Sequence, residues 1–271
     1  MVKVRGKRGY MRIGIVGFGF IGRHLYQRLM QGGEPGLSVA FVWNRSPGKV
    51  AGVPLGLILR DLAEAAAKRA DLIVEVAHPA VTRAHGADFV AAADYLVTSV
   101  TALADDALRG KLVETALARK HRLFVPHGAL VGLDTLVEQR HRLAEVTITF
   151  RKHPKNLDFA ESGIDPEIVK GPTVLYDGPA RGIAPMFPRN INTMITCALA
   201  TVGLDKCRAV LIADPALDKA YAEIEARGHD GSRIATWNEQ PATGVSGNDM
   251  LASIIGSVRA AVGRPPGMAF V

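Results

Sequence analysis

Short apolar runs alternate with amphipathic stretches through the first half of the chain. The runs have the composition of buried strands, and the stretches between them carry apolar residues at helical spacing. The strands expected from this pattern are Arg12–Val16, Val39–Trp43, Asp71–Val76, Tyr95–Ser99 and Arg122–Val125. The expected helices are the stretch that carries Leu25 and Leu29, Leu57–Lys68, Val81–Ala93, Asp105–Lys120 and Gly128–Leu143. This alternation predicts an α/β fold, in which a doubly wound parallel sheet has helices on both faces.

The pattern changes near residue 145, where most strand candidates follow one another without a helix between them. Glu145–Arg151 alternates polar and apolar residues, as a half-exposed strand does. Glycine and proline separate the further strand candidates, which are Thr173–Tyr176, Arg208–Ala213, Ala222–Arg227 and Arg233–Trp237. One helix, Ile191–Val202, is expected among them. We therefore predict a second, mixed α+β domain with a mainly antiparallel sheet, which supplies a substrate pocket.

The last periodic segment is Asp249–Val262, and its apolar residues share one helical face. Because such a face needs a packing partner, we expect this helix to dock back on the first domain. The predicted division of the chain is residues 11–130 for the first domain, 131–246 for the second domain and 247–271 for the C-terminal helix.

A glycine-rich turn joins the first expected strand to the helix that follows it. Its sequence is Gly17-Phe18-Gly19-Phe20-Ile21-Gly22, which has the G-x-G-x-x-G spacing of dinucleotide-binding turns. In such a turn the first glycine allows the bend, the second lets a pyrophosphate approach, and the third lets helix and strand pack closely. The helix N-terminus then offers free N–H groups to the phosphates. We predict that this turn, with Phe20 and Ile21, binds a dinucleotide; a tight turn that binds nothing is the alternative.

The end of the second expected strand bears on which nicotinamide dinucleotide is bound. An NAD-selecting fold places Asp or Glu about twenty residues beyond the glycine turn, where the carboxylate holds the ribose 2′-hydroxyl. Here the strand ends in Asn44-Arg45-Ser46, which has no carboxylate. Arg45 can pair with a 2′-phosphate, and Asn44 and Ser46 can donate hydrogen bonds. We therefore expect NADP, with NAD or an unliganded polar turn as alternatives.

Composition narrows the class of protein. The chain has 271 residues, of which 48% are hydrophobic and 22% charged, and its formal net charge is +7. Four of the basic residues lie within the first ten positions, so the remainder is only mildly basic. Because no basic stripe with interleaved aromatic residues occurs, we expect no nucleic-acid partner. No run of about 18 apolar residues occurs either, so we expect no membrane span.

Two cysteines, Cys197 and Cys207, are the whole complement of the chain. They do not form a C-x-x-C pair, so a disulfide framework or structural zinc is not expected, and we predict no metal site. The basic N-terminus lacks the apolar segment of a secretory signal. Together these features favour a cytoplasmic protein.

Three later segments, together with the glycine turn, resemble the L-aspartate dehydrogenase family. They are Pro126-His127-Gly128-Ala129-Leu130-Val131-Gly132-Leu133-Asp134, Phe187-Pro188-Arg189-Asn190-Ile191-Asn192 and Ala213-Asp214-Pro215. Their order and spacing resemble the family from Met11 to about Val262. The resemblance implies a Rossmann domain, a mixed catalytic domain and a homodimer. It also implies reversible, nicotinamide-linked conversion of L-aspartate to iminosuccinate, which is in equilibrium with oxaloacetate and ammonia.

The resemblance further implies where the cofactor binds. The loops Ala77-His78-Pro79 and Ser99–Ala102, the latter including Thr101, approach the cofactor. Both loops follow the carboxyl ends of expected parallel strands, where doubly wound sheets bind their ligands. Ala129 and Asn190 lie near the nicotinamide or the substrate by the same resemblance. For Asn190, an N-cap of the following helix is the alternative role.

A substrate with two carboxylates requires cationic partners. Lys152 and Arg189 are the candidates that we select, although a solvated or structural role would also explain each of them. We expect Ala222 to lie at the substrate as well, because its position matches a substrate-side residue of the family.

One position departs from the family's pattern. Family members carry an Asn-x-His motif shortly after the Ala-Asp segment, and this histidine is thought to act as the acid/base. On an ungapped match, Ala220 and Ala222 replace the asparagine and the histidine, and a methyl group transfers no proton. His127 is the surrogate that we favour, since an imidazole titrates near neutral pH. Asn190 is the second catalytic candidate.

Two classes of function follow. The first is an NAD(P)-dependent amino-acid dehydrogenase or imine reductase that acts on aspartate or a close, anionic analogue. The second is a non-catalytic NADP(H)-binding sensor, which the missing histidine suggests. A reductase of a different imine or carbonyl compound is a further alternative within the first class.

Overall fold

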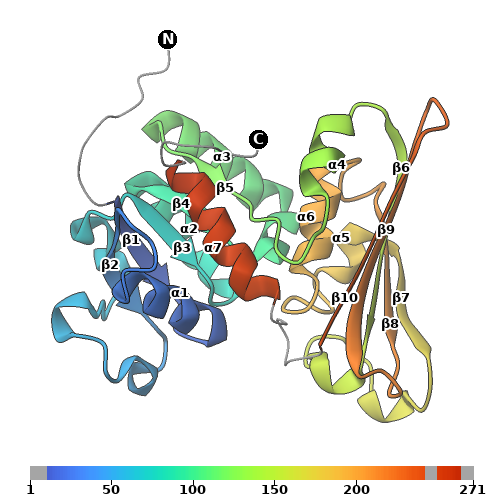
Figure 1. The fold of residues 1–271 in the computed structure, drawn as a ribbon, viewed down its shortest axis with the longest axis horizontal. Helices are drawn as coiled ribbons and strands as arrows, with labels where there is room; N and C mark the ends of the chain where they lie inside the picture. Colours follow the sequence, from blue (N-terminus) through green and yellow to red (C-terminus); the bar gives the residue numbers. More distant parts are fainter. Residues whose placement is uncertain (1–10, 242–248, 264–271) are drawn as a thin grey trace.

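The first half of the chain forms the parallel sheet that its alternating pattern predicts (Figure 1). The computed structural model describes residues 11–241 and 249–263. The strands are β1 (Met11–Val16), β2 (Leu37–Trp43), β3 (Leu72–Glu75), β4 (Asp94–Val97) and β5 (Leu123–Phe124). They lie in the order β2-β1-β3-β4-β5, and every neighbouring pair is parallel. The strand order changes direction between β1 and β3, which is where doubly wound sheets bind ligands.

Helices cover both faces of this sheet (Figure 1). Helices α1 (Phe20–Met30) and α7 (Asp249–Val262) lie on one face, and α2 (Pro79–Ala92) and α3 (Asp106–Arg119) lie on the other. Side chains of successive strand residues point to opposite faces. Ile13 and Ile15 therefore join Leu25 and Ile254 in one core. Ile73 and Tyr95 contribute to the other core, in which the Tyr95 ring lies 5.5 Å from the ring of Phe89.

A buried carboxylate fixes α7 to the first sheet. Glu34 is only 5% exposed and forms ion pairs with Arg259 of α7 and Arg28 of α1, at 2.7 and 3.0 Å. Burial raises the pKa of Glu34, but the hydrogen bonds and positive charges of the two arginines outweigh it, so the net pKa is lowered. The carboxylate is therefore ionised at neutral pH and holds two helices that are distant in sequence.

The second sheet is mixed. Its strands are β6 (Leu143–Lys152), β7 (Thr173–Pro179), β8 (Arg208–Ala213), β9 (Lys219–Gly228) and β10 (Arg233–Pro241). They lie in the order β10-β9-β6-β8-β7, in which β6 and β8 are parallel and the other pairs antiparallel. Helices α4 (Leu133–Gln139), α5 (Ala180–Ile183) and α6 (Asn192–Ala200) lie between this sheet and the first domain (Figure 1). The predicted fold class, a Rossmann domain plus a mixed α+β domain, is confirmed.

Two expected helices differ from the structure. In place of a helix over residues 57–68, Ile58 forms a β-bridge with Val42, and a 3-10 helix begins only at Leu62, where Asp61 caps it by accepting a hydrogen bond from the Ala63 N–H. The helix expected from Gly128 to Leu143 is limited to α4. Gly128 and Gly132 have φ values of +63° and +75°, so the chain turns there before the helix begins.

The two sheets are joined on one side by hydrogen bonds. The N–H and hydroxyl of Thr101 both donate to Asn192 Oδ1, at 3.0 and 3.2 Å, and the hydroxyl also donates to the Pro188 carbonyl. Arg181 of α5 reaches the Ala104 carbonyl and the Asp106 carboxylate of the first domain. These contacts fix how the two domains face each other. In the described part of the chain, no helix has the length and apolar character that crossing a membrane requires.

Candidate active site

The glycine-rich turn between β1 and α1 has the shape that a dinucleotide requires. Gly17 has φ of +105°, and a Cβ there would lie 2.7 Å from the Val76 carbonyl oxygen. A Cβ at Gly22 would clash with the Gly17 carbonyl oxygen, whereas a Cβ at Gly19 would meet no atom within 4 Å. Gly19 is also the N-cap of α1 and leaves its first-turn N–H groups without a side-chain cap. The turn is therefore tight where the fold needs it and open where a pyrophosphate approaches.

The residues at the end of β2 complete this corner. Asn44 Oδ1 accepts a hydrogen bond from the Phe18 N–H at 3.0 Å, and its Nδ2 donates to the Ser46 carbonyl at 3.1 Å. Asn44 therefore braces the glycine turn, which is a structural role that the sequence did not predict. Arg45 and Ser46 are exposed, and Arg45 forms no ion pair with any described residue. Arg45 is thus the side chain of this turn that is free to meet a phosphate.

A buried carboxylate organises the two loops that follow β3 and β4. Glu75 is fully buried, and its Oε1 accepts hydrogen bonds from the Ala77 N–H, the His78 N–H and the Ser99 hydroxyl at 2.7, 2.9 and 2.8 Å. Its Oε2 accepts from the Ser99 N–H at 3.1 Å and from the Thr82 hydroxyl at 3.3 Å. Burial raises the pKa of Glu75, and these hydrogen bonds act in the opposite direction. One side chain therefore sets the shape of both loops.

A cleft opens between the carboxyl ends of the first sheet and the helices and strands of the second domain. It encloses about 1070 Å³ of empty space, part of which is open to solvent. Nine of the site residues expected from the sequence line it: Ile21, Ala77, Pro79, Ser99, Ala129, Lys152, Arg189, Asn190 and Ala222. The structure thus brings together residues from both domains that are far apart in the chain.

Three expected site residues have other positions. His78 caps α2 by accepting a hydrogen bond from the Ala80 N–H on Nδ1; burial lowers its pKa, and nearby arginines lower it further. Thr101 is buried and used in the contact between domains. His127 is not among the cleft-lining residues, and a Cβ on Gly256 of α7 would lie 4.0 Å from its Nε2. An imidazole turned toward α7 does not serve the cleft, so we do not retain His127 as the proton-transfer group.

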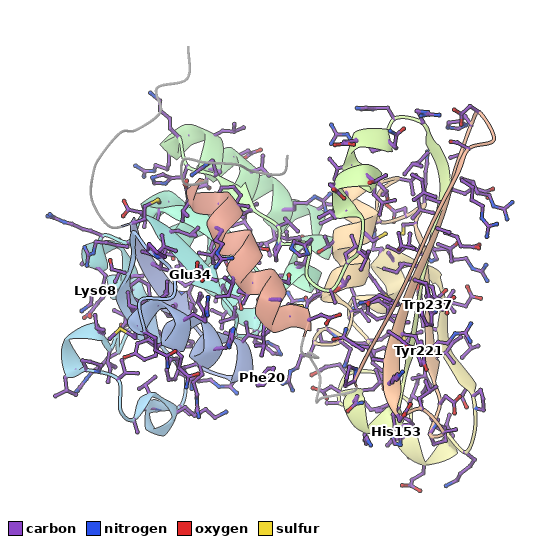
Figure 2. The ribbon with its side chains drawn as sticks, in the orientation of Figure 1. Phe20, Glu34, Lys68, His153, Tyr221 and Trp237 are labelled. Carbon is purple, nitrogen blue, oxygen red and sulfur yellow. The ribbon has the colours of Figure 1, made fainter. Side chains whose placement is uncertain are left out.

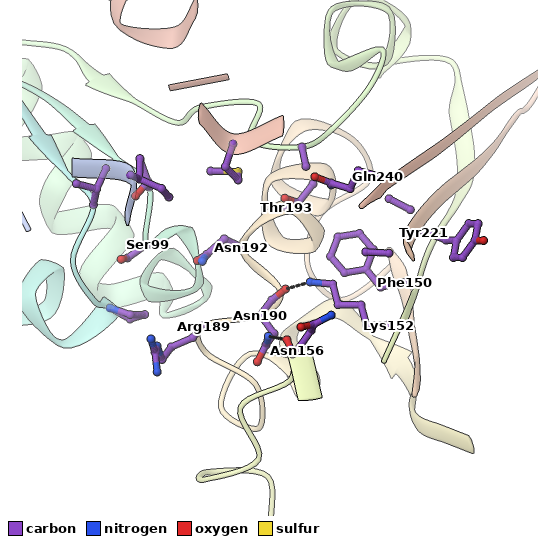
Figure 3. Close-up of a pocket in the computed structure, with 18 of the residues that line it drawn as sticks. Ser99, Phe150, Lys152, Asn156, Arg189, Asn190, Asn192, Thr193, Tyr221 and Gln240 are labelled. Carbon is purple, nitrogen blue, oxygen red and sulfur yellow. Dashed lines mark hydrogen bonds between the residues drawn. The ribbon is translucent and has the colours of Figure 1, made fainter. Parts of the chain in front are cut away.

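Asn190 connects the segments at the floor of the cleft (Figure 3). Its Oδ1 accepts a hydrogen bond from the Asp158 N–H at 2.8 Å, and its Nδ2 donates to the Asn156 carbonyl at 2.9 Å. Its own carbonyl accepts from Lys152 Nζ at 3.4 Å. The N-cap of α6 is Ile191, so the alternative role of Asn190 as a helix cap is wrong.

The two expected cations of the cleft have different surroundings. Arg189 forms an ion pair with Asp158 at 2.8 Å, and its side chain is 50% exposed. Lys152 has no carboxylate within ion-pair distance among the described residues. Its ammonium lies 5.0 Å from the centre of the Phe150 ring. Lys152 is only half-buried by surface area, yet protein surrounds its ammonium closely enough for desolvation to lower its pKa to about 8.

Ala222 lies on the cleft side of the second sheet. It faces Phe150 across β9 and β6, and Ala220 shares that face because strand side chains alternate. Tyr221 points the other way (Figure 3), and its ring lies 5.9 Å from that of Trp237 on β10. The two alanines therefore line the cleft beside Lys152.

Sequence reasoning missed three side chains of this site. Glu75 was counted as part of an apolar strand, although a lone carboxylate in a buried strand is itself a signal. Asn156 lines the cleft, is 5% exposed, and its Nδ2 has no partner among the described residues. Gln240 lines it from the end of β10. No sequence pattern near Asn156 or Gln240 indicates that either side chain lines the cleft. The turn at residues 154–156 places Asn156 in the cleft, and the register of β10 against β9 places Gln240.

Comparison with known proteins agrees with this architecture. The family described as "Aspartate dehydrogenase, C-terminal" matches residues 134–259, and the family described as "Homoserine dehydrogenase, NAD binding domain" matches residues 17–126. The second match covers the whole glycine turn and the strands β2 to β5 of the parallel sheet. Together with the open Gly19 corner, it identifies NAD(P) as the cofactor and the chain as an NAD(P)-dependent dehydrogenase.

Relatives match most of the chain. The aspartate dehydrogenase domain-containing protein of Xenopus tropicalis is 40% identical over 227 residues, which is 80% of each chain. L-aspartate dehydrogenase 1 of Bordetella pertussis is 36% identical over 224 residues, covering 82% of this chain and 84% of its own. The crystal structure of aspartate dehydrogenase from Thermotoga maritima has the same fold, with a TM-score of 0.74 at 24% identity over 96% of this chain and 100% of that one. The chain therefore belongs to the aspartate dehydrogenase family.

Proposed function

We propose that this protein oxidises the amine of L-aspartate, or of a close anionic analogue, to an imine that hydrolyses to a 2-oxo acid and ammonia, and that it catalyses the reverse reduction. The observation that carries this proposal is the cleft that joins the dinucleotide corner to Lys152, Asn190 and Arg189. The L-aspartate dehydrogenase of Bordetella pertussis, which is 36% identical, supports the choice of substrate.

The charge of the cleft supports an anionic substrate. Lys152 and Arg189 both line it, and no Asp or Glu is among the described residues that do so. Because Asp158 already neutralises part of the Arg189 charge, Lys152 is the stronger partner for a carboxylate. The unpaired Asn156 Nδ2 is a further donor that a bound carboxylate can satisfy.

Each domain has a separate task in the proposed mechanism. A nicotinamide held at the glycine turn would supply the hydride chemistry. The loops held by Glu75 would place Ala77, Pro79 and Ser99 beside it, and Asn190 holds Lys152 and the segment at residues 156–158 at the floor of the cleft. Closing the substrate between the domains excludes water, which protects the imine until it is released for hydrolysis.

NADP is the cofactor that we favour over NAD. The end of β2 carries no carboxylate, and Arg45 is exposed and unpaired among the described residues. The positive charges of Arg45 and Arg189 are near enough to lower the pKa of His78, so this side of the cleft favours anions.

We also propose a homodimer that forms through the open face of the second sheet. Val174, Ile212, Arg151 and Tyr221 are successive cross-strand neighbours on that face. Val174 is 58% exposed, and Trp237, beside Tyr221, is 57% exposed (Figure 2). A second copy of the chain can bury the exposed side chains of Val174 and Trp237. Light scattering should give twice 28.9 kDa, and Trp237→Asp should lower the mass; a monomeric wild type would contradict the proposal.

Two alternatives remain for the same cleft. The alanine at position 222, where the resemblance implies a histidine, favours either a binding protein without turnover or a reductase of a different imine or carbonyl compound. The two free, buried cysteines are compatible with the reducing cytoplasm in which we place the protein.

A substrate panel separates these functions. Purified protein is assayed for NADPH and NADH oxidation with oxaloacetate and ammonia, and with other 2-oxo acids and amines, alongside cofactor binding by fluorescence. Turnover that is fastest with oxaloacetate and ammonia supports the proposal. Tight NADPH binding without turnover on the whole panel supports the sensor. In Ala222→His, a large gain in aspartate turnover would show that the scaffold retains the family's pocket.

A further inference from the structure

The cleft contains very few groups that can transfer a proton. Among the described residues that line it, the titratable ones are Lys152, Arg189 and Tyr221. Arg189 stays protonated at every relevant pH and is paired with Asp158. The Tyr221 ring lies on the opposite face of β9, against Trp237. This elimination leaves Lys152.

Lys152 is also well placed for this role. It ends β6 on the face that carries Phe150, and the adjacent strand β9 presents only the methyl groups of Ala220 and Ala222 to that face. Among the described residues, its ammonium donates one hydrogen bond, of 3.4 Å, to the Asn190 carbonyl. An ammonium has three donors, so protons remain available to a molecule in the cleft.

We propose that Lys152 is the proton-transfer group of the reaction in this cleft, next to the position on the neighbouring strand, Ala222, where the resemblance implies a histidine. The inference rests on the proposed function. In the reductive direction, the carbon of the protonated imine accepts the hydride, and the π electrons of the C=N bond become the lone pair of the amine nitrogen. This lone pair takes a proton from the Lys152 ammonium: an Nζ–H bond breaks, a new N–H bond forms, and the neutral amine of Lys152 regains a proton from water.

The oxidative direction reverses this step. The neutral Lys152 amine removes a proton from the substrate ammonium, and the freed lone pair then forms the C=N bond as the hydride leaves for NAD(P)+. Once the resulting ammonium has released its proton to solvent, the same amine can take a proton from the water that attacks the imine. Both roles require a lysine that changes its protonation state near neutral pH.

The electrostatic surroundings of Lys152 permit this change. Desolvation is the cause that lowers its pKa to about 8. The Asp214 carboxylate, which follows β8, accepts a hydrogen bond from the Ala216 N–H of its own turn, and the Asp158 carboxylate is paired with Arg189. Strand β9 offers no charge on this face. A bound substrate carboxylate then favours the ammonium, which is the form that donates.

The test compares two substitutions with a neighbouring control. Lys152→Met removes the amine, and Lys152→Arg keeps a cation that cannot lose its proton. Lys155→Met changes an exposed lysine of the same segment. We expect kcat to fall roughly 100-fold or more in both Lys152 variants, with NADPH affinity within about threefold of wild type. The limb of the kcat/KM pH profile that reports this base should disappear, while Lys155→Met should behave as wild type.

A second readout does not depend on turnover. NMR of ¹³C-methylated lysines, without cofactor, should show one resonance that titrates near pH 8 and is missing in Lys152→Met. If Lys152→Arg has wild-type kcat and a raised KM, Lys152 serves only to bind the substrate. That result would overturn this inference and leave the proposed function standing. A Lys152 resonance that titrates with the exposed lysines would also overturn it. A wild type without turnover on the substrate panel overturns the proposed function, and this inference with it.

Discussion

The carboxylate of Glu75 holds two loops of the cleft, so replacing it with glutamine perturbs the site without changing its volume. Five donors converge on the two oxygens, of which three are backbone N–H groups. A glutamine amide keeps one oxygen and replaces the other with an NH2 group. If that NH2 faces the Ser99 N–H, one backbone donor is left unpaired; if it faces Ala77 and His78, two are.

The magnitude follows from this count. A buried donor without an acceptor costs about 1–3 kcal/mol, so the better amide orientation predicts a loss of about 2 kcal/mol in the free energy of unfolding. For a chain of this size, that loss lowers the melting temperature by roughly 4–8 °C. Because the same loops line the cleft, a comparable loss in the bound state would raise the NADPH dissociation constant roughly tenfold or more.

Thermal unfolding and fluorescence titration with NADPH measure the two effects. Glu64→Gln, at an exposed carboxylate of the same domain, is the matched control and should change neither quantity. Burial raises the pKa of Glu75, so removing the charge also removes a desolvation cost. A Glu75→Gln protein as stable as wild type or more stable, with unchanged NADPH affinity, would show that this cost exceeds the value of the hydrogen bonds. That outcome would refute the reasoning.

The remaining predictions concern the cofactor corner and the docking of α7. Gly19→Ala should leave the melting temperature near that of wild type but weaken NADPH binding. Gly22→Ala should lower the melting temperature, because its Cβ meets the Gly17 carbonyl oxygen. Equal melting temperatures of the two variants would contradict this prediction. Arg45→Ser should weaken NADPH binding roughly tenfold and leave NADH binding almost unchanged, measured by fluorescence titration; parallel losses would exclude a 2′-phosphate contact. Glu34→Gln should cost about 1–2 kcal/mol at pH 7, since both guanidinium groups are about half exposed. The folded pKa of Glu34 is lowered, so its contribution is complete above the unfolded pKa of about 4.3 and is lost as pH falls toward the folded pKa. Denaturant titrations at pH 7 and pH 3.5 check this, and a difference between wild type and variant that grows at pH 3.5 would contradict it.

The sequence predicted helices and strands correctly where neighbouring residues determine them. The predictions were wrong where the geometry of a loop determines the structure. The strands of the first sheet and the glycine turn follow from residues close together in the sequence, and the structure reproduces them within a few positions. The helix expected over residues 57–68 was wrong because Ile58 pairs with Val42 and the Asp61 cap starts a 3-10 helix only at Leu62. His127 has a suitable side chain, but it is not among the residues that line the cleft, and its Nε2 lies beside Gly256 of α7.

By itself, the sequence determined the fold class and the dinucleotide turn, because apolar periodicity and glycine spacing are properties of neighbouring residues. The resemblance of three further segments, with the glycine turn, indicated the family. Only the tertiary structure decided which side chains share the cleft. The register of β9 against β6 sets Ala220 and Ala222 beside Lys152, and the turn after β6 brings Asn156 to Asn190. The carboxylate of Glu75 became important only when loops from two strands closed around it. These contacts depend on strand pairing and burial, which couple residues that no local pattern connects.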